Sequence, residues 1–233
     1  MLVTKENELK IVKKFKKFMD EHDILYEEDA RNYILDYFMP SIYDNCAPDI
    51  LLEIMEELGL THVNGDFYQE HLDRIKNDFG LSRNITEIGG GWIPSFAEKI
   101  AKEQIKMSKG TITVYDPQLI IDTPKYANMT LIKDKFNLDS DVSKSDLLIG
   151  ILPCEATKSI IESAANNNID FYIAMCGCVH SSNPFINNPF YYQKEITSYA
   201  SRLCNESNLG DLVVDYLPNN FDLRYPILKN KRK

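Results

Sequence analysis

The sequence predicts an α/β fold in which seven strands form one mostly parallel sheet, and three observations support this. From residue 84 onward, short β-branched runs alternate with helical segments of about 12 to 17 residues, which is typical of a parallel sheet. The first run ends in consecutive glycines, and a helical pattern follows at once. The last two runs are joined by the short link 218–222, which suits an antiparallel strand pair.

Strands and helices alternate through this part of the chain. The strands are rich in β-branched and aliphatic residues and are expected at 85–88, 111–115, 129–132, 147–152, 171–175, 212–217 and 223–228. The helices carry apolar residues at helical spacing and are expected at 94–107, 117–126, 156–165 and 191–204. Their order places a helix or turn at the end of each of the first five strands.

Residues 1–80 have a different pattern, which is helical throughout. Apolar residues recur at helical spacing, and prolines and glycines mark the helix ends. Pro48 begins a helix that Gly59 ends, and Asp66 caps a last helix that Gly80 ends. We therefore expect an all-α region attached to the sheet domain, with the boundary near residue 80.

The charge balance bears on the class of partner. The chain has 35 acidic and 26 basic residues and a formal net charge of −9, which repels a phosphate backbone unless basic side chains gather on one surface. Two basic clusters exist, and we interpret both as solvated surface charge. They comprise Lys10, Lys13, Lys14, Lys16 and Lys17, and the closing run Lys229, Lys231, Arg232 and Lys233. Nucleic acid is therefore the runner-up substrate.

The sequence also bears on location. The N-terminal residues lack the apolar core of a signal peptide, and no segment reaches the roughly 18 to 20 apolar residues that a membrane span requires. The five cysteines are an odd number and do not resemble a secreted disulfide framework. We expect a cytoplasmic protein with reduced thiols and no membrane partner.

A glycine-rich loop after the first strand is the strongest chemical signal in the chain. Glycines at such a strand end let the backbone turn sharply and let a ligand approach the main chain. The dinucleotide motif G-x-G-x-x-G has its third glycine where this chain has Pro94. The signal for NAD or FAD is therefore weak. S-adenosylmethionine carries a positive sulfonium and amino group, and Glu87 supplies an acidic residue just before the turn. The residues of this loop are Glu87, Gly89, Gly90, Gly91 and Trp92.

The run Glu87-Ile-Gly89-Gly90-Gly91 resembles the first motif of the class I S-adenosylmethionine-dependent methyltransferases, written as an acidic residue, x, G, x, G, x, G. Ile93 departs from it, because the last glycine of the motif usually lies there. The resemblance covers roughly residues 84–230. It implies S-adenosylmethionine as the cofactor, a Rossmann-like sheet of seven strands, and an antiparallel pair at its end.

Asp116 closes the second predicted strand and stands just before Pro117. In the family that the glycine loop resembles, an acidic residue at this place holds the ribose hydroxyls of the cofactor. The resemblance therefore implies cofactor contacts at Asp116 and Pro117. The alternative is an aspartate that only forms a turn before a proline.

The ends of the fourth and fifth strands supply further candidates. Asp146-Leu-Leu-Ile-Gly-Ile-Leu-Pro-Cys-Glu-Ala-Thr resembles the fourth-strand motif of the same family, nearest the subgroup whose later strand ends in Pro-Cys-Cys-His. The resemblance implies that the segment Leu152, Pro153 and Cys154 lies beside the cofactor. Members of that subgroup include RNA methyltransferases, which keeps an RNA acceptor open. Glu155 and His180 are the available bases, and the alternative for His180 is a residue of a polar turn.

Cys154, Cys176, Cys178 and His180 raise the question of a metal. If the later segment is extended, residues 176, 178 and 180 face one side, and four such ligands suit tetrahedral zinc. Against this, Cys-x-Cys-x-His is not the usual Cys-x-x-Cys spacing, and buried cysteines are ordinary small hydrophobic residues. The sequence therefore favours a site without metal.

The hypothesis that follows is an enzyme that transfers a methyl group from S-adenosylmethionine to an acceptor, either a small molecule or RNA, by in-line displacement. Residues 81–233 form the cofactor-binding domain, and residues 1–80 cap the site and select the acceptor. Two alternatives remain at this point: a non-catalytic binding or sensor protein with the same fold, and a nicotinamide-dependent oxidoreductase.

Overall fold

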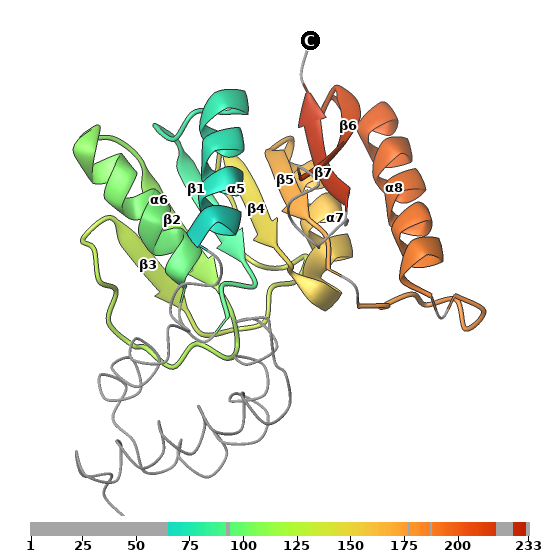
Figure 1. Ribbon diagram of the computed structural model, residues 1–233, viewed down its shortest axis with the longest axis horizontal. Coiled ribbons are helices and arrows are strands. Elements are labelled where there is room, and N and C mark those ends of the chain that lie inside the picture. The colour runs from blue at the N-terminus through green and yellow to red at the C-terminus, as the bar shows by residue number, and fades with distance from the viewer. Residues whose placement is uncertain (1–64, 92–93, 177, 187, 218–225, 232–233) are drawn as a thin grey trace, which may run out of the picture. The chain divides into compact units, whose positions relative to one another are not determined.

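The computed structural model describes residues 65–91, 94–176, 178–186, 188–217 and 226–231 (Figure 1). The chain divides into two compact units, Met1–Gln69 and Glu70–Lys233. Nearly all of the first unit lies outside the described residues, and so do the predicted helices before residue 65. The division of the chain at residue 80 therefore stays a prediction.

One sheet of seven strands forms the centre of the second unit, in the order β3-β2-β1-β4-β5-β7-β6 (Figure 1). Strand β7 runs antiparallel to both of its neighbours, and the pairs among β1 to β5 are parallel. This confirms the predicted α/β class and its final antiparallel pair. The strands are β1 (Asn84–Ile88), β2 (Thr111–Tyr115), β3 (Met129–Ile132), β4 (Leu147–Ile151), β5 (Asp170–Ala174), β6 (Asp211–Tyr216) and β7 (Pro226–Lys231).

Helices cover both faces of the sheet. They are α5 (Gly65–Asp78), α6 (Ser95–Lys106), the short 3₁₀ helix η3 (Cys154–Ala156), α7 (Thr157–Asn167) and α8 (Pro189–Glu206). Phe171 and Ile173 belong to the core cluster that includes the apolar residues of α7 and α8. Tyr172 lies between them in β5 and bonds to His71 of α5, so α5 lies on the opposite face. None of the described helices is long and apolar enough to cross a membrane.

Burial explains why the strands next to the site are so apolar. Every residue of β4 and of β5 is buried, as expected for central strands covered on both faces. Leu147 and Phe171 are fully buried, and each such side chain contributes roughly 1.5 to 3 kcal/mol relative to exposure. The strand ends that carry the candidate residues are therefore fixed by a rigid centre.

The helix predicted at 117–126 is wrong. The structure has a turn and irregular backbone between Asp116 and the start of β3. Asp116 Oδ1 accepts the N–H of Gln118 at 2.7 Å, which closes a turn where a helix would begin. Pro124 removes a backbone donor and restricts the residue before it. The buried Leu119 and Ile120 imitate a helical pattern, although they pack from an irregular segment.

Ion pairs hold α5 against the antiparallel end of the sheet. Arg74 pairs with Asp215 at 2.5 Å, and Lys229 pairs with Asp78 at 2.6 Å and with Asp215 at 3.4 Å. The assignment of Lys229 to a solvated basic run is wrong, because only 13% of its side chain is exposed. Gly80 follows α5 with a φ of +74°, which confirms its predicted role at the end of this helix.

Candidate functional site

The candidate residues gather where β1, β2, β4 and β5 end. The chain passes from β1 outward to β2 and β3, then returns to place β4 on the other side of β1. In open α/β sheets, ligands bind beyond the carboxyl ends of the strands at such a reversal. The two loops that the sequence singled out, after β1 and after β4, are therefore neighbours.

Gly89 joins these two loops. Its φ is +80°, and its N–H donates to the carbonyl oxygen of Tyr115 at 3.0 Å. A Cβ at this position would lie 3.1 Å from the Cα of Pro153, so a side chain here would press on the backbone of the loop after β4. Glycine is required both for the left-handed backbone and for the close approach.

Gly90 packs directly onto the sheet. A Cβ there would lie 2.6 Å from Val114 Cγ1, a distance that real Cβ atoms do not show, and 3.3 Å from Pro94 Cβ, which is a tight contact. The same position lies 3.5 Å from Glu87 Oε2. The glycine loop thus passes closely over the carboxylate of Glu87.

Glu87 is the most unusual residue of the site. It is 2% exposed, and it accepts the backbone N–H of Ala97 in the first turn of α6. Its Oε2 has no hydrogen-bond partner among the residues that the structure describes. Burial, with a smaller effect of the nearby Asp116, raises the pKa of Glu87 to about 8, although the Ala97 N–H lowers it.

Asp116 links the second strand to the glycine loop. Its Oδ2 accepts the N–H of Gly91 at 2.8 Å, and its Oδ1 accepts the N–H of Gln118 at 2.7 Å. Asp116 therefore forms a turn, which was the alternative role expected from the sequence. Its contact with the ribose of a cofactor stays a prediction. Pro117 follows as an exposed residue of the turn. Trp92 and Ile93 lie outside the described residues.

The loop after β4 has a strained backbone. Leu152 and Cys154 have φ values of +55° and +46°, a region that costs non-glycine residues of order 1 to 3 kcal/mol. Between them, Pro153 folds back over Gly150, where a Cβ would lie 2.7 Å from Pro153 Cγ. The sequence interpretation missed Gly150, although a glycine inside a strand signals such a close approach.

Sulfur atoms and an imidazole gather beside this loop. Cys154 Sγ lies 3.8 Å from Cys178 Sγ, and one ligand atom each from Cys154, Cys178 and His180 lie within 4.8 Å of one another. Cys176 is buried, and the hydrogen bond from Cys154 is the main cause that lowers its pKa to about 6. Tyr192, which the sequence interpretation missed, contacts His180 edge to face at 6.4 Å between ring centroids.

The two proposed bases have ordinary surroundings. Glu155 is 61% exposed and pairs with Lys135 at 3.0 Å. His180 is exposed next to the thiols. These contacts do not test a catalytic role, so both assignments stay predictions.

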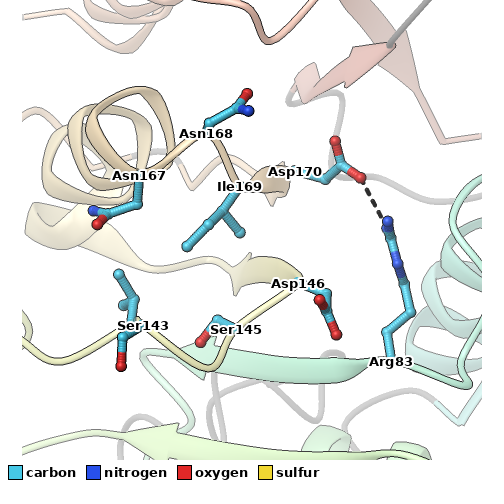
Figure 2. Close-up of a pocket in the computed structure, with 9 residues that line it drawn as sticks. Arg83, Ser143, Ser145, Asp146, Asn167, Asn168, Ile169 and Asp170 are labelled. Carbon is cyan, nitrogen blue, oxygen red and sulfur yellow. Dashed lines mark hydrogen bonds and ion pairs between the residues drawn. The ribbon is translucent and has the colours of Figure 1, made fainter.

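A pocket of about 350 Å³ lies at the opposite, amino edge of the sheet (Figure 2). Figure 2 shows Arg83 reaching Asp170, and the two side chains pair at 2.9 Å. The other oxygen of Asp170 accepts the amide of Asn230 at 2.9 Å. Its carboxylate is therefore satisfied by the fold, and the position is opposite to the ligand-binding edge of such sheets. We assign this pocket a structural role.

No protein-family model matches the sequence, and no curated protein is similar to it in sequence. Among solved structures, human N-acetylserotonin methyltransferase in complex with SAM is 13% identical, with a TM-score of 0.43 over 85% of this chain and 59% of that one. The CMeT domain of the citrinin polyketide synthase is 14% identical, with a TM-score of 0.46 over 78% and 57%. A point mutant of MtNAS in complex with S-adenosylmethionine is 11% identical, with a TM-score of 0.42 over 95% and 77%. The chain thus spans less than two thirds of the first two proteins.

Proposed function

We propose that this protein binds S-adenosylmethionine at the carboxyl ends of β1 and β2 and transfers the methyl group of that cofactor to an acceptor. The observation that carries the proposal is the buried Glu87 carboxylate, whose Oε2 has no partner among the described residues and lies under the glycine loop. A buried carboxylate without a partner is costly, and it is typical of a site where a cation binds.

The residues present fit this cofactor in three respects. Its amino and sulfonium groups are positive, and such a cation beside Oε2 would favour the ionised form of Glu87, whose pKa burial raises to about 8. Gly89 and Gly90 let the turn after β1 pack tightly against Pro153 and Val114, as in a glycine-rich cofactor loop. Asp116 accepts one N–H at each oxygen, and a carboxylate has about four acceptor sites, so ribose hydroxyls can still bond to it.

Little catalytic machinery is needed for the proposed reaction. The bound cofactor supplies an electrophilic methyl group, and the protein contributes mainly alignment of the attacking atom. The strained segment Leu152–Cys154 packs on Gly89 and would fix one wall of the site. Glu155 and His180 are the proposed groups that accept the proton of the acceptor.

The charge of the chain favours a small acceptor. A net charge of −9 repels a polyanion, so RNA ranks second among the proposed acceptors. Recovery of labelled methyl groups in the small-molecule fraction rather than in RNA, after incubation with a cell extract, would support this ranking.

Calorimetric titration with S-adenosylhomocysteine tests the binding step. We expect heat with the wild-type protein and at least about tenfold weaker binding by Glu87→Gln, since about 1.4 kcal/mol corresponds to a factor of ten. Glu103→Gln is the matched control, because Glu103 lies on the surface of α6 and pairs with Lys106. Absence of heat with the wild type, where an established methyltransferase binds, would reject the proposal.

A non-catalytic binding protein is the second candidate. The observation in its favour is that Glu155 is exposed and paired with Lys135 instead of facing a partner in a buried site. The two candidates differ in turnover. Binding of S-adenosylhomocysteine with no transfer of labelled methyl groups to any acceptor pool would favour this second function.

A further inference from the structure

We propose that Cys154, Cys176, Cys178 and His180 bind one zinc ion between the loops that follow β4 and β5. The proposal rests on the geometry of Cys154, Cys178 and His180. A zinc-bound His180 could not accept a proton, so Glu155 would then remain as the proposed base of methyl transfer. The sequence alone favoured cysteines without a metal, because the spacing in the chain does not show how the two loops approach each other. The structure favours a metal site.

The separation of the thiols matches zinc ligation. Tetrahedral zinc bonds sulfur at about 2.3 Å, which places two sulfur ligands about 3.8 Å apart. Cys154 Sγ and Cys178 Sγ are 3.8 Å apart. A disulfide would require about 2.05 Å, and the four cysteines that the structure describes are free thiols.

Sheet topology brings the other two ligands to the same place. Strands β4 and β5 are paired, with Ile151 opposite Ala174, so the residues that follow each strand emerge side by side. Cys154, Cys178 and His180 each bring one ligand atom to within 4.8 Å of the others. Cys176 is buried two residues before Cys178, and we take it as the fourth ligand. Three ligand atoms therefore converge from two loops, and Cys176 stands next to them in the chain.

The ligand set defines the metal class. Three thiolates and one imidazole are soft and borderline ligands, and zinc takes this combination in closed structural sites. Four protein ligands leave no open position for water, so the proposed ion stabilises structure and does not act as a Lewis acid. It would hold the left-handed backbone of Cys154 in place next to Pro153, which contacts Gly89.

Metal analysis of the full-length protein, purified with reductant and without chelator, tests the proposal directly. We expect about one equivalent of zinc, and Co²⁺ substitution should give the strong visible bands of tetrahedral thiolate coordination. Cys178→Ser should lose most of the zinc, because it removes one thiolate ligand. It should still fold, because Cys178 is exposed and its replacement leaves the core intact. Cys204→Ser is the matched control, because Cys204 is buried in α8 outside the cluster and should leave the zinc content unchanged.

Three outcomes would overturn the proposal. They are less than about a tenth of an equivalent of zinc in the wild type after reconstitution, an equal loss of zinc in Cys204→Ser and Cys178→Ser, and a Cys154–Cys178 disulfide in freshly isolated protein. Each is measured without reference to cofactor binding. Failure of the zinc site and failure of the proposed function are therefore distinguishable.

Discussion

Glu87 at the carboxyl edge of the sheet and Asp170 at its amino edge are both deeply buried carboxylates, with exposed fractions of 2% and 6%. Asp170 bonds to Arg83 through one oxygen and to Asn230 through the other. Glu87 bonds to Ala97, and its Oε2 lacks a partner among the described residues. The fold thus supplies partners for both oxygens of Asp170 and for only one oxygen of Glu87, and this difference separates the structural edge from the proposed binding edge.

The largest expected effect comes from Gly90→Val, which would displace the glycine loop at the carboxyl edge. The new side chain meets Val114 Cγ1 at less than contact distance, so we expect a loss of about 1 to 3 kcal/mol in the free energy of unfolding and no measurable binding of S-adenosylhomocysteine. Denaturant unfolding and calorimetry measure the two effects. Gly80→Ala is the control, since Gly80 has a φ of +74° and open space around it, and should lose about 1 kcal/mol with unchanged binding. Full binding by Gly90→Val would contradict the location of the site.

Asp170→Asn tests the amino edge. It removes the charge that pairs with Arg83, and we expect a loss of about 1 to 3 kcal/mol in the free energy of unfolding at pH 7. Binding of S-adenosylhomocysteine should stay at the wild-type value. Weaker binding by this variant would mean that the two edges do not differ as described.

Glu87→Gln tests the pH dependence at the carboxyl edge. The folded pKa of about 8 lies above the ordinary value of 4.5, so the folded protein keeps a proton that the unfolded chain releases. The stabilising effect of this proton is complete below about pH 4.5 and is lost as the pH rises through about 8. We therefore expect Glu87→Gln to be more stable relative to wild type at about pH 9 than at about pH 5, by urea unfolding. Parallel pH profiles for the two proteins would contradict the buried state of Glu87.

The smallest expected effect on stability is that of Glu155→Gln. Its ion pair with Lys135 is largely exposed, so the free energy of unfolding should change by less than about 0.5 kcal/mol. A turnover assay on the same variant tests the proposed role of Glu155 as a base. Turnover equal to wild type would contradict the proposed role of Glu155 as a base.

The alternation of strands and helices was enough to predict the sheet. A strand that is buried on both faces, such as β4, has an apolar sequence that can be recognised directly. The segment after Asp116 shows the limit of this method, because Leu119 and Ile120 are buried for reasons of tertiary packing. The glycine loop was recognisable because its requirements are local. Its closest contacts are between Gly90 and Val114 and between Gly89 and Pro153. These contacts join separate segments, so the sequence of the loop does not predict them.

The same limit applies to the sulfur cluster. Cys176, Cys178 and His180 are near one another in the chain, but Cys154 joins them only through the pairing of β4 with β5. Spacing alone therefore favoured cysteines without a metal. The distance of 3.8 Å between the sulfur atoms of Cys154 and Cys178 favours a metal site instead.

The hydrogen bond from Gly91 to Asp116 fixes part of the proposed site before a ligand binds. Because Asp116 already fixes the backbone N–H at the end of the glycine turn, this part of the site has its shape before any ligand arrives. Such preorganisation lowers the conformational entropy that binding must remove. Affinity here then depends on few contacts, and even a small ligand fragment such as adenosine should show measurable, if weak, occupancy.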